Sequence, residues 1–147
     1  MGEQEVMQAV LEKFSIDESK ANIARERRIF IEVDMENYKD VMAFLKNSLD
    51  FTMLCTITGL DMNDHYQLIY HVSDDHGLIV NLKLNIDKSN ATVDTITHIY
   101  EGTTLYEREL VDLFGINVTG LPEGNRYPLP DGWPEGQHPL RKDWKAE

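Results

Sequence analysis

The chain is poor in cysteine, in basic residues and in long apolar runs, and each shortage excludes a class of protein. Its 147 residues include one cysteine, Cys55, which cannot form an internal disulfide or supply a thiolate metal site by itself. The 14 lysines and arginines against 26 aspartates and glutamates give a net charge of −12, which argues against binding to nucleic acid or anionic lipid. No apolar run approaches the ~20 residues of a membrane helix, and the N-terminus lacks a signal-peptide core. We therefore expect a soluble, intracellular protein.

Proline is absent from residues 1–120, and this absence divides the chain. All five prolines and both tryptophans lie in residues 121–147, where four basic and five acidic side chains nearly cancel. The body, residues 1–120, therefore carries a net charge of −11. A hydrophobic fraction of 41% is enough to build a core. We expect a single α+β domain over residues 1–120 and an extended, Pro-rich C-terminal strap over residues 121–147.

The body alternates between helical and strand patterns. Helical spacing of apolar residues occurs in 6–14, 38–49 and 104–114, and β-branched or aromatic runs indicate strands at 29–33, 51–58, 65–72 and 78–86. A short helical piece is expected in 94–102. Thr104 and Glu107 have capping-box spacing, and Gly115 stands where a left-handed stop is expected. This order predicts an antiparallel or mixed sheet with helices packed mainly on one face.

Acidic and histidine side chains gather at two predicted turns, and neither group has a known metal-ligand spacing. The groups are Asp61, Asp64 and His65, and then His71, Asp74, Asp75 and His76. Because aspartate favours turns through local hydrogen bonds, we predict solvated turns and no metal site. Cys55 lies in an apolar strand and is predicted to pack as a small hydrophobic side chain. The usual motifs of nucleotide loops, serine hydrolases and zinc peptidases are also absent.

The helix predicted at 104–114 carries three charges ahead of its apolar end. Glu107, Arg108 and Glu109 precede Asp112, and Arg108 and Asp112 are i,i+4 partners. One interpretation is a solvated helix surface with a weak ion pair. The other is a partly covered face that anchors the strap or a partner protein.

The strap is rich in side chains that anchor protein interfaces. Its prolines exclude a helix or a central strand, yet aromatic and arginine residues are interleaved throughout, unlike in a flexible linker. These residues are Arg126, Tyr127, Trp133, Arg141 and Trp144. We therefore predict that the strap docks on a partner surface and is not a disordered end.

Two motifs stand in order on either side of a proline-rich connector. The first is Tyr106-Glu107-Arg108-Glu109 followed by Asp112-Leu113-Phe114-Gly115-Ile116, and the second is His138-Pro139-Leu140-Arg141-Lys142-Asp143. Together they resemble the 30-kDa (C) subunit family of respiratory NADH dehydrogenase, which also occurs in membrane-bound energy-converting hydrogenases. The expected order of elements in residues 28–100 is similar as well. One position differs, because Leu121 stands where the respiratory members usually carry a histidine. In this respect the chain is more similar to the hydrogenase-type or ferredoxin-linked members.

The resemblance implies a cofactor-free accessory subunit that docks on a large catalytic subunit of the 49-kDa or NiFe-hydrogenase-like kind, beside a small iron–sulfur subunit. Iron–sulfur clusters, with a nickel–iron centre or a nucleotide, would lie in those partners. The chain would be peripheral, on the cytoplasmic face of the membrane, and attached only through the complex. No catalytic, cofactor-binding or metal-binding residue is expected. The residues expected to form the family motifs and to dock are Glu107, Arg108, Glu109, Asp112, Phe114, Gly115, Arg126, Trp133, His138, Pro139, Leu140, Arg141, Lys142 and Asp143.

Several functions stay open at this point. The first expectation is a subunit of an energy-converting hydrogenase, in which Arg108, Arg126 and Arg141 make bidentate contacts to the partner. The alternative is the C subunit of a respiratory NADH:quinone or F420H2-type dehydrogenase. A different class is a stand-alone acid–base enzyme using Glu107, Glu109, Asp112 and His138, which requires a cleft with a perturbed carboxylate. A generic protein-binding module would leave the paired motifs unexplained.

Overall fold

The computed structural model describes residues 1–146, and the chain divides into two compact units. Unit 1 comprises residues 1–58 and 68–84, and unit 2 comprises residues 59–67 and the chain from residue 85 onward. The strap falls within unit 2.

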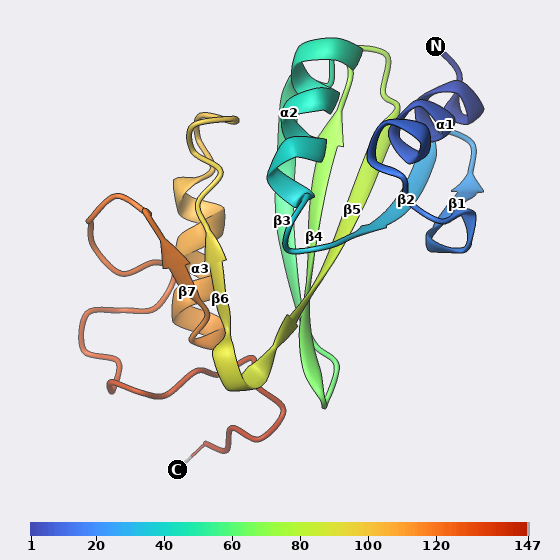
Figure 1. Cartoon of the computed structure of the whole chain (residues 1–147). Coiled ribbons are helices and arrows are strands. Elements are labelled where there is room, and N and C mark those ends of the chain that lie inside the picture. Colours follow the sequence, from blue (N-terminus) through green and yellow to red (C-terminus); the bar gives the residue numbers. More distant parts are fainter. Residues whose placement is uncertain (147) are drawn as a thin grey trace. The chain divides into compact units, whose positions relative to one another are not determined.

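A five-stranded mixed sheet organises the first half of the chain (Figure 1). Its strands are β1 (Ala21–Arg25), β2 (Arg28–Val33), β3 (Met53–Asp61), β4 (His65–Ser73) and β5 (Ile79–Asp87), in the order β1-β2-β5-β4-β3. β1 and β2 form an antiparallel hairpin, whereas β2 pairs in parallel with β5. The α+β class with a mixed sheet is therefore confirmed. Strand β1 was not predicted, because most of its residues are exposed and show no alternation of apolar and polar side chains.

Two amphipathic helices cover the core of unit 1. They are α1 (Glu3–Phe14) and α2 (Tyr38–Leu49), and a short 3-10 turn, η1 (Glu18–Lys20), follows α1. Helix α1 contacts α2, β1 and β2. In β2 the side chains alternate as the sequence pattern predicts, with Ile29, Ile31 and Val33 buried. Tyr38 of α2 stacks on Tyr70 of β4, with ring centroids 6.2 Å apart, so α2 covers this strand.

Unit 2 is built around one helix and a small parallel sheet. Its elements after β5 are η2 (Lys88–Asn90), β6 (Thr92–Asp94), α3 (Thr104–Phe114) and β7 (Asn117–Thr119). β6 pairs with β7 in parallel, with Val93 opposite Val118. The helical piece predicted in 94–102 is limited to one turn after β6, which ends at Asp94. In this turn the Tyr100 amide donates to the Ile96 carbonyl (2.9 Å).

Two smaller expectations concern membranes and Cys55. Among residues 1–146, no helix combines the length and the apolar character that a bilayer crossing requires. Cys55 is half-buried in β3, so it is less enclosed than the prediction of a packed hydrophobic side chain assumed.

Candidate interaction site around helix α3 and the strap

The motif carboxylate Glu107 lies inside unit 2. Its side chain, 1% exposed, accepts hydrogen bonds from the Thr95 hydroxyl (2.7 Å), the Thr103 hydroxyl (3.0 Å) and the Ile96 amide (3.2 Å). Burial raises the pKa of Glu107, and these three hydrogen bonds oppose the rise. The predicted capping box is wrong, because Thr104 is the first residue of α3 and Glu107 bonds the segment before the helix.

Arg108 fastens the first part of the strap to α3. Its guanidinium group donates to the carbonyls of Pro122 (2.6 Å) and Asn125 (3.2 Å). Gly124 passes so close to this group that a Cβ at that position would collide with it. The Arg108 guanidinium group therefore donates to the strap backbone, and it does not form the expected ion pair with Asp112.

Asp112 holds the middle of the strap. Its buried carboxylate accepts a hydrogen bond from the Leu129 amide (3.3 Å) and lies 3.9 Å from Nε of Arg126. Arg126 in turn donates through Nη1 to the Trp133 carbonyl (2.6 Å). One helix carboxylate therefore orders two separate points of the strap. The interpretation of a solvated helix surface is wrong for Glu107 and Asp112, and the covered face that anchors the strap describes them correctly.

The last carbonyls of α3 receive three donors from the second motif. A helix C-terminus leaves its final carbonyls without partners inside the helix, so they need donors from elsewhere. The pairs are His138 Nδ1 to the Asp112 carbonyl (2.8 Å), the Leu140 amide to the Leu113 carbonyl (3.0 Å), and Arg141 Nε to the Phe114 carbonyl (2.5 Å). Arg141 also places a positive charge at the negative end of the helix dipole.

Gly115 is required at this junction for two reasons. Its backbone is left-handed, with φ of 74°, and its amide closes the helix on the carbonyls of Leu110 and Val111. His138 and Arg141 also lie so close that a Cβ at Gly115 would overlap both side chains. The predicted glycine stop is therefore confirmed, and its close approach to the second motif explains why the two motifs belong together.

Asp61 holds the end of the strap. Its carboxylate accepts hydrogen bonds from the amides of Lys142 and Asn63, both at 2.9 Å, and pairs with the Lys88 ammonium group at 2.7 Å. Burial alone would raise the pKa of Asp61, but these partners outweigh it and hold the pKa at about 2. Lys88 also lies 5.0 Å above the ring of Tyr66. The prediction of a solvated turn is wrong for Asp61.

The two tryptophans form a small cluster within the strap. The ring centroids of Trp133 and Trp144 lie 6.0 Å apart. Both indole N–H groups donate to Gln137, one to its backbone carbonyl (2.8 Å) and one to its side-chain oxygen (3.4 Å). The strap is thus folded by its own contacts as well as by α3.

Residues 31–147, which include α3 and the strap, match the family described as "Respiratory-chain NADH dehydrogenase, 30 Kd subunit". The chain is also 32% identical over 144 residues to the C subunit of F(420)H(2) dehydrogenase from Methanosarcina mazei, covering 96% of this chain and 90% of that one. The chain belongs to this 30-kDa-subunit family.

Two further comparisons agree with this assignment. The C subunit of NADH-quinone oxidoreductase from Roseiflexus sp. strain RS-1 is 36% identical over 114 residues, covering 74% of this chain and 64% of that one. A chain in the solved structure of the membrane-bound sulfane sulfur reductase, an archaeal respiratory membrane complex, aligns with a TM-score of 0.85 and 27% identity, covering 97% of this chain and 85% of that chain. Membership makes the chain a subunit of a multisubunit respiratory complex.

The family motifs gather most of the expected residues in one place. Glu107, Arg108, Asp112, Phe114 and Gly115 meet the strap or the core of unit 2, as do Arg126, Trp133, His138, Arg141 and the amide of Lys142. Glu109 and Pro139 are half-buried, and Leu140, Lys142 and Asp143 have exposed side chains.

The sequence alone did not identify Asp61 and Lys88 as residues of this site. A period-two reading of Ile57, Gly59 and Asp61 places all three on one face of β3, and Ile57 on that face is buried, so this pattern could have indicated Asp61.

The carboxylates of the acid–base hypothesis do not converge on a cleft. Glu107 faces the turn before α3, Asp112 faces the strap, and His138 donates to a helix carbonyl. A hollow of about 170 Å³ beside α3 is lined by Arg108, Asp112 and Arg126, whose polar groups bind the strap. In the part of the chain that the structure describes, no group of three or more His, Cys, Asp or Glu side chains could hold a metal ion.

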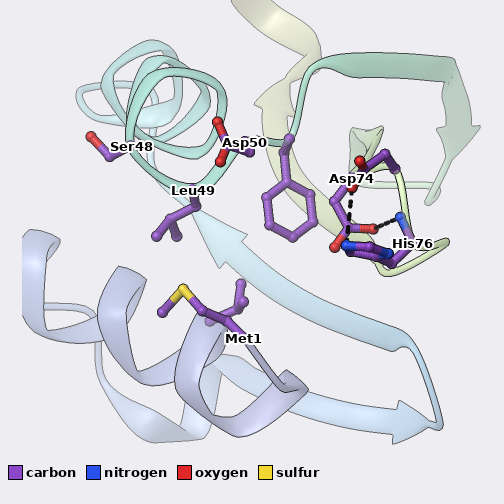
Figure 2. A pocket seen from close by; sticks show the side chains of 9 residues that line it. Met1, Ser48, Leu49, Asp50, Asp74 and His76 are labelled. Carbon is purple, nitrogen blue, oxygen red and sulfur yellow. Dashed lines mark hydrogen bonds and ion pairs between the residues drawn. The ribbon is translucent and has the colours of Figure 1, made fainter.

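A second hollow, of about 190 Å³, lies within unit 1 (Figure 2). Ser48 and Asp50 at the end of α2, together with Asp74 and His76 in the β4–β5 turn, line it. Asp74 accepts a hydrogen bond from the His76 amide (2.9 Å), which is the local turn bonding that the sequence predicts. The solvated-turn prediction is wrong for His71, which lies in β4 and bonds Thr58 (2.8 Å).

Proposed function

We propose that this chain is a cofactor-free accessory subunit whose strap forms a preformed docking surface for the large catalytic subunit of its complex. The main support for this proposal is that the motif side chains bind groups of their own chain. Arg108, Asp112 and Arg141 bind strap or helix backbone and do not surround a substrate. An ordered strap binds a partner without the entropy cost of folding on contact.

The docking contacts differ from those expected from the sequence. Arg108, Arg126 and Arg141 were expected to make bidentate contacts with a partner, but each donates to a carbonyl of its own chain. Large apolar side chains remain available instead, since Tyr127 is 40% exposed and Leu140 is 51% exposed. We therefore propose an interface that is apolar at its centre. The arginines would hold the strap in the conformation that presents this apolar surface.

The type of complex has two supported candidates. The F420H2 dehydrogenase type is favoured by a relative that aligns with nearly the whole of both chains. The energy-converting hydrogenase type is favoured by Leu121, since the resemblance implies a histidine at this place in most respiratory members of the family. In either case we place iron–sulfur clusters, with a nickel–iron centre or a nucleotide, in the large and small partner subunits. The chain itself would be peripheral, on the cytoplasmic face of the membrane. Genes adjacent to this one distinguish the two types through the electron-donor subunit that they encode.

Copurification from native membranes tests the docking role. A tagged wild-type chain should recover the large subunit, and Leu140→Glu should lose most of it because a charge is placed at the centre of the apolar surface. Leu105→Glu is a matched control, since Leu105 is 52% exposed and lies at the start of α3, outside the strap. Equal recovery with both variants would overturn the proposed role of the strap.

A further inference from the structure

The β1–β2 hairpin is a basic region in an acidic chain. Residues 20–28 hold four basic side chains and one acidic one, a local charge of +3 in a chain of −12. β1 is the outermost strand of its sheet, beyond β2 (Figure 1). Residues 22–27 are all exposed. The hairpin therefore presents concentrated positive charge at an open sheet edge.

Two features of this hairpin lower its stability. Arg25 lies directly opposite Arg28 in the antiparallel register, and like charges in this position repel each other. Arg27 has a left-handed backbone with φ of 62°, a conformation that glycine or asparagine adopts at lower cost. Two unfavourable choices in one short turn indicate a requirement other than folding.

The chain neutralises these charges only in part. Lys20 Nζ lies 3.8 Å from the Asp34 carboxylate, and both side chains are exposed. The carboxylate of Glu26 lies 4.0 Å from Arg27 Nε, and both side chains are largely exposed. Arg28 donates to the carbonyls of Arg27 (2.8 Å) and Gly77 (3.2 Å), which bind its N–H groups without cancelling its charge. The Arg25 side chain forms no hydrogen bond or ion pair with any residue in 1–146. The Glu3 carboxylate also lies at this turn, where it accepts a hydrogen bond from the Arg27 amide (2.7 Å).

We infer that the β1 edge and the arginines of this hairpin form a docking site for an extended acidic segment of a partner protein. An added strand can pair with the free edge of β1 through its backbone. Because side chains alternate between the two faces of a sheet, acidic residues at every second position of that strand would share a face with Arg25. Charge complementarity selects this partner, and a net charge of −12 argues against an anionic membrane as the occupant. The inference lies in unit 1 and does not depend on the docking role of the strap.

A labelled peptide of alternating threonine and glutamate tests the site by fluorescence anisotropy with the full chain. We expect binding that weakens as salt increases, and about tenfold weaker binding by Arg25→Gln/Arg27→Gln. The control variant is Lys13→Gln/Lys145→Gln, which removes the same charge from two exposed side chains elsewhere and should bind as the wild type does. The hairpin variant should also melt no lower than the wild type, because the substitution relieves repulsion.

Two further arms separate strand pairing from simple charge attraction. N-methylation of alternate amides along one edge of the peptide should abolish binding, and methylation along the other edge should preserve it, because only one edge faces β1. Equal binding by both methylated peptides, equal loss in the hairpin and control variants, or binding only to vesicles rich in anionic lipid would each overturn the inference.

Discussion

Replacement of Asp61 should loosen the end of the strap while leaving the rest of unit 2 in place. Asp61→Asn keeps the shape and one oxygen of the side chain but removes the charge that pairs with Lys88 at 2.7 Å. The pKa of about 2, against an ordinary 3.8, means that the folded state favours the charged form by about 2 kcal/mol, since one pKa unit corresponds to about 1.4 kcal/mol. We expect the variant to lose about 2 kcal/mol of unfolding free energy at neutral pH.

The effect should depend on pH in one direction. Because the pKa of Asp61 is lower in the folded state, its contribution is fully present above 3.8 and is lost as the pH falls through about 2. The difference between wild type and Asp61→Asn should therefore be constant near neutral pH and shrink between pH 3.8 and 2.

Urea unfolding with two probes measures this loss. Both tryptophans, Trp133 and Trp144, lie in the strap, so tryptophan fluorescence follows the strap while far-ultraviolet circular dichroism follows the helices and sheet. In Asp61→Asn the fluorescence change should come at a lower urea concentration than the dichroism change. Asp64→Asn is the control, because Asp64 lies in the same turn with its side chain 86% exposed. If Asp61→Asn loses no more stability than Asp64→Asn, the buried ion pair does not hold the strap.

Three further substitutions test the packing described above. Phe114→Ala should cost about 3–5 kcal/mol in urea unfolding, because the ring is buried and packs edge-on against Tyr66 at 5.8 Å. Gly59→Ala should lower the melting temperature, since its Cβ would lie 2.6 Å from the Phe114 ring, and an unchanged melting temperature would contradict this close approach. Arg27→Gly should raise the unfolding free energy by about 1 kcal/mol by relieving the left-handed backbone, while the amide that Glu3 accepts is retained; a loss would show that the Arg27 side chain stabilises the turn.

The local elements could be predicted from the sequence because their signals are local. The alternation in β2, the apolar stripe of α2 and the stop at Gly115 each depend on neighbours within a few residues, and each is found in the structure. The paired motifs identified the family for a similar reason. Each motif is a short segment of neighbouring residues, and the two appear in a fixed order.

The partners of the charged residues could not be predicted in the same way. Arg108 and Arg141 suit a partner surface and the strap equally well by residue type, and only the fold shows that they bind their own chain. Asp61 was read as a turn residue because its partner, Lys142, is 81 residues away. The sequence of β1 shows no alternation of apolar and polar residues, because an exposed edge strand needs no apolar face.

The bond between Asp61 and Lys142 also sets an order of events during synthesis. The β3–β4 turn leaves the ribosome well before Lys142 does, so the Asp61 carboxylate has only Asn63 and Lys88 as partners until Lys142 is made, 81 residues later. Closing a loop of this length costs chain entropy, which is offset only when the strap seats on α3 and on the turn together. A chain that stops before Lys142 would lack the amide that Asp61 binds, so the end of its strap would be held only by the contacts of His138, Leu140 and Arg141 with α3.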